Sequence, residues 1–190
     1  APEVSQRVFR VVLDALARPG QLGQLPAQPG VAPVLLPLLA LADLDTAACV
    51  LTGSDSGTGW ADLVTLATSA PAVPVDRARL VAALRPIRPD ELRALPRGTA
   101  LAPEDGALVT LAVATELWSA PTARTTRATR FRLAGPGIPG RRETLLPMSA
   151  ELLTARAEAV AGYPAGIDLL LVDPAGRVLG LPRTTTIEER

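Results

Sequence analysis

Apolar and charged side chains alternate at helical spacing at the start of the chain. The aliphatic positions that recur every three or four residues are Val4, Val8, Val11, Val12 and Leu16. Such a stripe predicts an amphipathic helix, because residues three and four apart share one face. The helix should end at Pro19-Gly20, since proline disfavours helical backbone at its predecessor and glycine turns freely. We expect a loop from there to Ala32.

The same pattern divides most of the chain into short helices and strands. It predicts, in order, a buried helix over 33–42, a strand over 47–51, a loop over 53–59, a helix over 60–67, a short helix from 89, a strand covered on both faces over 107–114, a strand with one buried face over 129–133, an irregular loop over 135–140 and a helix from Ser149 to Gly162. Between 73 and 84 the pattern leaves helix and strand open.

A hairpin is predicted near the C-terminal end. Apolar runs over 167–172 and 178–181 flank Asp173-Pro174-Ala175-Gly176, in which proline at the second turn position and glycine at the fourth suit a type I turn. Aromatic residues make up only 3% of the chain, so aliphatic side chains must fill the core, which suits helices packed on a sheet. We therefore expect residues 1–190 to form a single α/β domain with three layers and a mixed sheet.

The residue types that are missing exclude several chemistries. The chain has no His and no Lys, so its 19 basic residues are all arginine. Without Lys there is no pyridoxal-phosphate aldimine and no P-loop lysine, and without His there is no Ser-His or Cys-His pair and no imidazole metal ligand. Because 19 acidic residues balance the arginines, we expect no general attraction to nucleic acid or to an anionic membrane.

Cysteine usage and hydropathy bear on the compartment. Cys49 is the single cysteine and lies in an apolar run, which predicts a buried, reduced thiol. The longest apolar segment, residues 31–42, is too short for a bilayer span, and no secretory signal is visible. We expect a cytoplasmic protein without a membrane partner.

Asp43-Leu44-Asp45-Thr46 is similar to the D-x-D-x-T motif of haloacid-dehalogenase-type phosphatases, in which one aspartate attacks phosphorus. On this alternative the chain is a stand-alone Mg²⁺-dependent phosphate-processing enzyme that uses Asp43 and Asp45. That motif should follow a strand, whereas a helix is predicted before it here. A turn that ends the helix is the favoured interpretation.

Two further features could bind anions. The loop over 53–59 could present backbone N–H groups at a helix N-terminus, although it matches no phosphate-loop motif and Asp55 would repel an anion. Guanidinium groups match phosphate and carboxylate oxygens, and arginines are dense at Arg124, Arg127, Arg130, Arg132, Arg141 and Arg142. The first four are candidate anion-binding residues, with a solvated strand face as the alternative.

Asp168 interrupts the apolar start of the hairpin, and a buried carboxylate needs paired donors. Arg183 is the candidate partner. Either the two form a structural ion pair that joins strand ends, or Pro182-Arg183-Thr184-Thr185 leaves the sheet and offers its donors to another protein. On the second alternative Asp168, Pro182, Arg183, Thr184 and Thr185 are partner-binding residues.

Segments along most of the chain resemble the PhnH family of the bacterial carbon-phosphorus lyase system. Each is weak alone, but their order is specific: Gln6, Phe9-Arg10, Ala15, Pro19-Gly20, Leu41-Ala42-Asp43, Asp45-Thr46, Gly98-Thr99, Pro103-Glu104, Gly135-Pro136-Gly137-Ile138, Pro164, Gly166-Ile167-Asp168 and Leu181-Pro182-Arg183-Thr184-Thr185. The chain departs from the family at Leu108, at Tyr163 and in an expanded segment over 119–129.

The resemblance implies a fold similar to the large domain of pyridoxal-phosphate transferases without their cofactor site, in agreement with the missing lysine. It implies a non-catalytic structural subunit, without cofactor or metal, of the carbon-phosphorus lyase core complex, with PhnG, PhnI, PhnJ and the accessory PhnL as partners. That assembly couples a phosphonate to the ribose of ATP, displacing adenine, before a radical enzyme cleaves the C–P bond. We further expect the chain to form a homodimer when it is alone.

Overall fold

The computed structural model describes residues 2–53, 59–113, 118 and 129–189. Their largest element is a six-stranded sheet in the order β1-β8-β7-β4-β3-β2. Its strands are β1 (Leu22–Gln24), β2 (Ala48–Leu51), β3 (Leu80–Ala83), β4 (Leu108–Ala112), β7 (Asp168–Val172) and β8 (Arg177–Leu181). Strands β2, β3, β4 and β7 run parallel, and β8 and β1 continue the sheet antiparallel. The main sheet is therefore mixed, as the sequence predicts.

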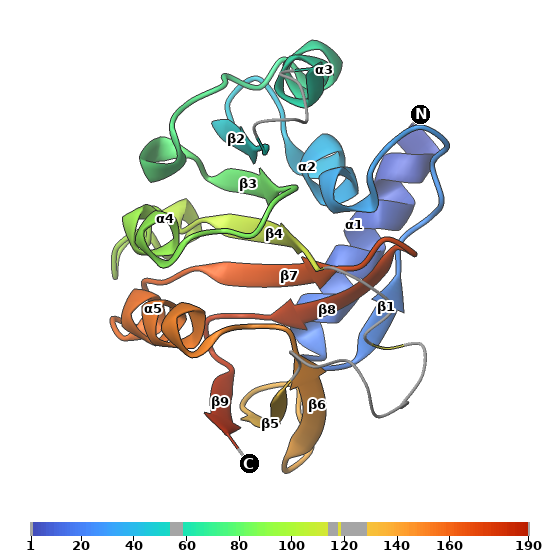
Figure 1. The fold of residues 1–190 in the computed structure, drawn as a ribbon. Coiled ribbons are helices and arrows are strands. Elements are labelled where there is room, and N and C mark those ends of the chain that lie inside the picture. Colours follow the sequence, from blue (N-terminus) through green and yellow to red (C-terminus); the bar gives the residue numbers. More distant parts are fainter. Residues whose placement is uncertain (1, 54–58, 114–117, 119–128, 190) are drawn as a thin grey trace.

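Helices cover both faces of this sheet. They are α1 (Pro2–Ala17), α2 (Leu36–Leu41), α3 (Gly59–Thr68), α4 (Pro89–Ala94) and α5 (Ala150–Val160), with 3-10 turns at Pro33–Leu35, Val75–Arg77 and Pro103–Asp105. In Figure 1, α1 passes behind the sheet, and α4 and α5 lie in front of it. Neighbouring residues of a strand face opposite sides, so Leu169 enters the core beneath α4 and α5, and Leu170 enters the core beneath α1 and α2.

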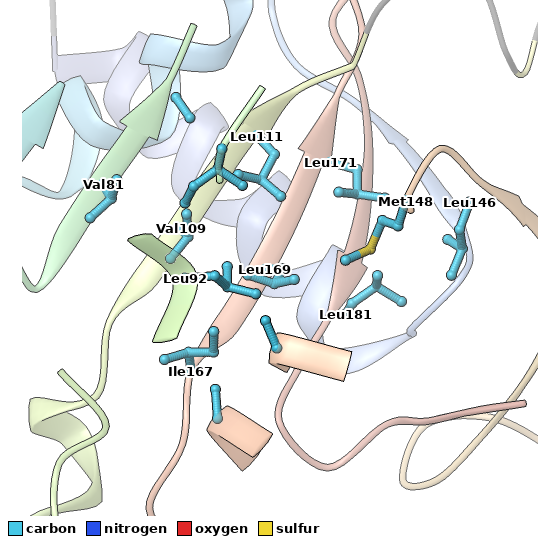
Figure 2. Close-up of a cluster of buried hydrophobic side chains, with 14 of the residues drawn as sticks. Val81, Leu92, Val109, Leu111, Leu146, Met148, Ile167, Leu169, Leu171 and Leu181 are labelled. Atoms are coloured by element: carbon cyan, nitrogen blue, oxygen red, sulfur yellow. The ribbon is translucent and has the colours of Figure 1, made fainter. Parts of the chain in front are cut away.

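The core beneath α4 and α5 is almost entirely aliphatic (Figure 2). Leu92 of α4 lies over the side chains that β4 and β7 direct to this face, among them Val109 and Leu169. All three side chains have no exposed surface. Removing apolar area from water on both sides of one sheet is the main stabilising contribution for such a fold.

Helix α1 approaches the opposite face closely, as its sequence stripe requires. Val8, Val12 and Ala15 are buried against the sheet. A Cβ at Gly180 of β8 would collide with the backbone of Ala15 and Leu16, so only glycine permits this distance between helix and strand.

A second, antiparallel sheet adds to the expected single one. Its order is β6-β5-β9, with β5 (Thr129–Ala134), β6 (Arg142–Leu146) and β9 (Thr186–Glu189). Phe131 and Leu133 are buried and Arg130 is exposed, as the alternation in β5 predicts. The prediction of one sheet was incomplete, because the chain leaves β8 at Pro182 and pairs its last strand with β5.

Two further differences from the sequence prediction concern strands. Residues 22–24 form β1 inside the expected loop, since pairing with β8 imposes a strand on a three-residue segment that has no alternation of its own. The segment over 73–84, for which the pattern did not decide between helix and strand, contains β3, which is buried at every position. A strand covered on both faces is continuously apolar and shows no period that separates it from a helix.

Local capping and turn signals are confirmed. The Ser149 hydroxyl accepts a hydrogen bond from the Leu152 N–H at 3.3 Å, which caps α5. In the hairpin turn, the Gly176 N–H donates to the Asp173 carbonyl at 2.9 Å. Within the described ranges, no helix combines the length and the apolarity that crossing a bilayer requires.

Candidate functional site

The predicted pair of Asp168 and Arg183 forms at the amino end of β7. The Arg183 backbone N–H donates to Asp168 Oδ1 at 2.7 Å, and Arg183 Nη2 donates to Oδ2 at 2.7 Å. Arg183 Nη1 donates to the carbonyls of Pro103 at 2.8 Å and Pro164 at 3.1 Å. The structural ion pair is therefore confirmed, and it also holds two loops. We call these four residues the arginine clamp.

Glycines make room for the clamp. A Cβ at Gly106 would collide with the Gly166 carbonyl and would lie 2.9 Å from Arg183 Nη2. A Cβ at Gly166 would lie 3.2 Å from Arg183 Cβ. Gly98, which begins the loop before Pro103, has a φ of 67°, in the left-handed region that favours glycine. Small residues thus form the walls of the slot that the Arg183 side chain occupies.

A second arginine, Arg156 of α5, fixes residues 182–185, which form the linker after β8. Arg156 is only 3% exposed, and its Nη2 donates to the carbonyls of Pro182 at 2.8 Å and Thr185 at 3.0 Å. Burial lowers the pKa of Arg156 to about 10, and the charge of Asp168 opposes this shift. Arg156 Nε and Thr185 Oγ1 are buried without a hydrogen-bond partner among the described residues. Residues 182–185 are therefore held between two guanidinium groups.

The clamp brings together segments that the family resemblance singles out far apart in the sequence. Four of them meet at one guanidinium: Pro103, Pro164, Gly166 with Asp168, and Arg183. Gly98-Thr99 closes the adjoining loop, where the Thr99 hydroxyl accepts from the Ala102 N–H at 3.0 Å. We conclude that these motif residues build one local structure.

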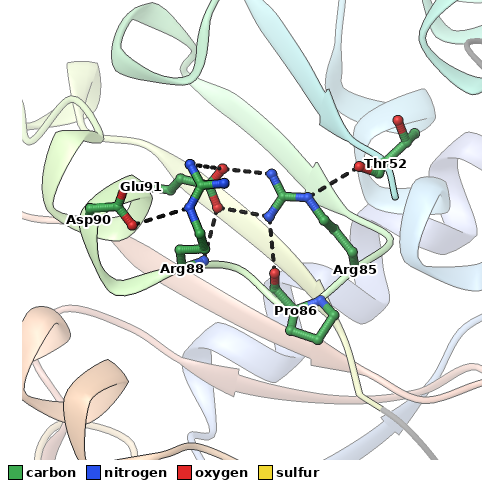
Figure 3. A network of polar contacts seen from close by, with 6 residues as sticks. All are labelled: Thr52, Arg85, Pro86, Arg88, Asp90 and Glu91. Carbon is green, nitrogen blue, oxygen red and sulfur yellow. Dashed lines mark hydrogen bonds and ion pairs between the residues drawn. The ribbon is translucent and has the colours of Figure 1, made fainter. Parts of the chain in front are cut away.

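A separate polar network lies at the carboxyl edge of the parallel strands (Figure 3). Arg85, which follows β3, donates to Thr52 O at 3.1 Å and to both carboxylate oxygens of Glu91 at 2.8 and 2.6 Å. The Arg88 N–H donates to Glu91 Oε2 at 2.9 Å. The hydrogen bonds from Arg85 and then from Arg88 hold the pKa of Glu91 at about 2, against burial. Glu91 is therefore a carboxylate at neutral pH.

Ligands of open α/β sheets bind at this edge. Here, however, the charged groups of the network form ion pairs with one another. Glu91 accepts from Arg85 and Arg88, and Asp90 Oδ1 accepts from Arg88 Nε at 3.3 Å. Burial first, and then the charge of Glu91, raise the pKa of the nearby Cys49 thiol, which favours its unreactive protonated form. The network ties β2, β3 and α4 together.

Asp43 closes a turn at the end of α2. Its Oδ1 accepts from the Thr46 hydroxyl at 2.6 Å and from the Asp45 N–H at 3.1 Å. The hydrogen bond from Thr46, followed by that from Asp45, lowers the pKa of Asp43. A helix precedes the motif, as predicted, and the described ranges contain no cluster of three or more carboxylate or thiol groups placed to hold a metal ion.

The predicted anion-binding arginines are only partly described. Arg124 and Arg127 lie outside the described residues, as does most of the loop over 53–59. Arg130 is on the exposed face of β5, 3.9 Å from Glu143, and Arg132 is half-buried on the same strand. An anion role for these residues stays a prediction.

Sequence analysis missed Arg156 and the pair of Arg85 and Glu91. Arg156 shows no signal, because its position inside a helix says nothing about the linker that packs over it. The signal for Glu91 was its place in the first turn of a helix that begins at Pro89, but its partner Arg85 precedes that helix and is fixed by the end of β3.

Comparison with known proteins bears on the family of the chain. A search of curated proteins found none that is similar to this chain. The family model described as bacterial phosphonate metabolism protein (PhnH) matches residues 1–188, in agreement with the resemblance in the sequence. The chain therefore belongs to the PhnH family of bacterial phosphonate metabolism proteins.

Proposed function

We propose that the chain is a non-catalytic structural subunit of the carbon-phosphorus lyase core complex, with PhnG, PhnI, PhnJ and PhnL as its partners. The observation that carries this proposal is the arginine clamp. Its four residues, all of which the family resemblance singles out, use their donors and acceptors in hydrogen bonds with one another, so their chemistry fixes the shape of the chain.

The position of the clamp supports this role. It lies at the amino ends of β4 and β7, opposite the carboxyl edge where α/β sheets bind their ligands. The two most buried carboxylates, Asp173 and Glu91, each form an ion pair with an arginine, and the less buried Asp168 does the same. A general base or nucleophile needs a group that is free to exchange a proton or attack a substrate.

We infer that the clamp serves docking by fixing the loops beside it. Leu101 is 97% exposed and Tyr163 is 69% exposed, and each stands within two residues of a carbonyl that Arg183 holds. A tyrosine on a rigid frame is a typical interface anchor, and an exposed leucine adds apolar area to the contact. The partner-binding role of Asp168 and of residues 182–185 is therefore indirect in this proposal.

The test co-expresses the chain with the other subunits and isolates the complex. We expect wild type to co-purify in fixed stoichiometry, and Leu101→Ser with Tyr163→Ser to weaken assembly without lowering thermal stability. The matched control is Leu66→Ser, because Leu66 is 88% exposed on α3 at the other end of the sheet. A wild-type chain that never enters the complex overturns the proposal.

An activity assay separates the proposal from the phosphate-processing alternative. We expect no Mg²⁺-dependent release of phosphate from phosphate esters or phosphonates by the homogeneous chain. Release that Asp43→Asn abolishes would establish the alternative based on Asp43 and Asp45. Light scattering on the same preparation tests the expected homodimer.

A further inference from the structure

Strand β1 ends the main sheet, so one of its edges is open. Among the described strands it pairs only with β8. The Leu25 N–H donates to the Gly176 carbonyl at 2.8 Å. Along an antiparallel strand, the backbone N–H and C=O groups of successive residues point alternately toward the paired strand and away from it. Gly23 and Leu25 therefore face β8, and Leu22 and Gln24 direct their backbone N–H and C=O groups toward the open edge.

A groove runs between this strand and α1. It has a volume of about 580 Å³, and it is lined by Arg7, Arg10 and Val11 of α1 and by residues 24–27. Its floor is apolar, since Val11, Leu25 and Pro26 contribute to it. The groove therefore offers apolar contacts next to backbone groups of β1 that pair with no other described strand.

The two arginines give the groove its charge. Arg7 and Arg10 are exposed, and neither forms an ion pair with any of the described residues. Asp14, four residues beyond Arg10, pairs instead with Arg18 at 3.3 Å. Two positive charges one helical turn apart thus stand beside the strand, and neither is in an ion pair with a described carboxylate.

We propose that β1 and this groove bind an extended acidic segment of a partner subunit, which adds a strand to the main sheet. The inference rests on the proposed function, because it names one surface by which the subunit joins its complex. Main-chain hydrogen bonds would supply affinity, and alternating side chains would supply specificity. Charge complementarity selects carboxylates for the side of the segment that faces α1.

The two faces of β1 also define the other side of the segment. Gly23 faces α1, because a Cβ there would lie 3.2 Å from Val11 Cγ1. Leu22 points to the opposite face and is 41% exposed. Side chains of an added strand alternate between the two faces of the sheet. Every second residue of the bound segment, on the face of α1, is therefore acidic, and the residues between them, on the face of Leu22, are apolar.

The experiment reverses the groove charges in the co-expressed complex. Arg7→Glu with Arg10→Glu is compared with Arg77→Glu and Arg141→Glu, a pair of exposed arginines elsewhere that changes net charge equally. We expect the groove variant to assemble about tenfold more weakly than wild type and the control to assemble normally. Hydrogen exchange should slow at the Leu22 and Gln24 amides when the complex forms. Thermal melts of both free variants verify that they are folded.

Three other outcomes would contradict the groove proposal, and they differ in what they say about the proposed function. If wild type forms the complex while both variants assemble equally and the β1 amides exchange as in the free chain, the groove proposal is wrong and the subunit role stands. If wild type forms no complex, the proposed function fails and the groove proposal fails with it. Protection of these amides that rises with the concentration of the chain alone assigns the edge to a second copy and overturns the proposal.

Discussion

Buried charged residues in this protein are stabilised by ion-pair partners that the fold places beside them. Glu91 is 7% exposed and would be costly to bury alone, but Arg85 contacts both of its oxygens. Asp168 and Arg183 repeat this arrangement at the opposite edge of the sheet. In each pair the two residues come from different segments, so the charge is stabilised only when those segments are in place.

The pH dependence of stability should show the pair of Glu91 and Arg85. The pKa of Glu91 is lowered from 4.5 to about 2, so the folded state binds this proton less tightly than the unfolded state. Its contribution is complete above pH 4.5 and falls as the pH drops toward 2. Between pH 6 and pH 3 wild type should lose about 2 kcal/mol more unfolding free energy than Glu91→Gln, measured by urea denaturation. Parallel pH dependences for the two proteins would contradict this.

At the scale of elements, the C-terminal segment joins the two sheets. After β8, residues 182–185 are held by Arg156 and by the clamp, and β9 then pairs with β5. Ile187 of β9 packs against the core beneath α4 and α5. The linker and the strand should therefore contribute separately to stability.

Two truncations distinguish the linker from the strand. Ending the chain after Thr185 removes β9 but keeps Arg183 and both acceptors of Arg156, and should cost about 1–2 kcal/mol. Ending it after Leu181 also strips Asp168 of its partner and Arg156 of its acceptors, and should cost at least about 3 kcal/mol more. Urea midpoints measure both. Equal midpoints for the two truncations would show that the arginines add nothing.

At the scale of the molecule, one sheet separates two cores, and each core carries one tryptophan. Trp60 packs against the core beneath α1 and α2. Trp118 packs against the core beneath α4 and α5, where its indole N–H donates to the Leu145 carbonyl at 3.4 Å. Because β3, β4, β7 and β8 contribute side chains to both cores, loss of either face should expose the other.

Single-tryptophan variants test whether the chain unfolds as one domain. Trp60→Phe leaves a fluorescence probe in one core, and Trp118→Phe leaves a probe in the other. In urea, each variant's fluorescence midpoint should coincide with its midpoint by far-ultraviolet circular dichroism. Each substitution should cost about 1 kcal/mol or less. Resolved transitions in either variant would show that the two faces unfold separately.

Much of the local structure follows from the sequence. The stripe of α1, the Ser149 cap, the turn at Asp173 and the alternation in β5 each depend on residues within a few positions of one another, and all are confirmed. The pairing of Asp168 with Arg183 was also predicted, because a carboxylate at the start of an apolar strand needs a nearby donor.

Tertiary structure alone decided the rest, because the remaining features depend on contacts between distant segments. A three-residue strand forms at β1 since β8 offers it an edge, and β9 crosses to the second sheet since residues 182–185 are held from α5 and from the clamp. Sequence reading identified Arg183 and its carboxylate. Only the fold placed the Pro103 and Pro164 carbonyls around it. Only the fold also set Arg7 and Arg10, which form no ion pair with a described residue, beside the last described strand of the main sheet.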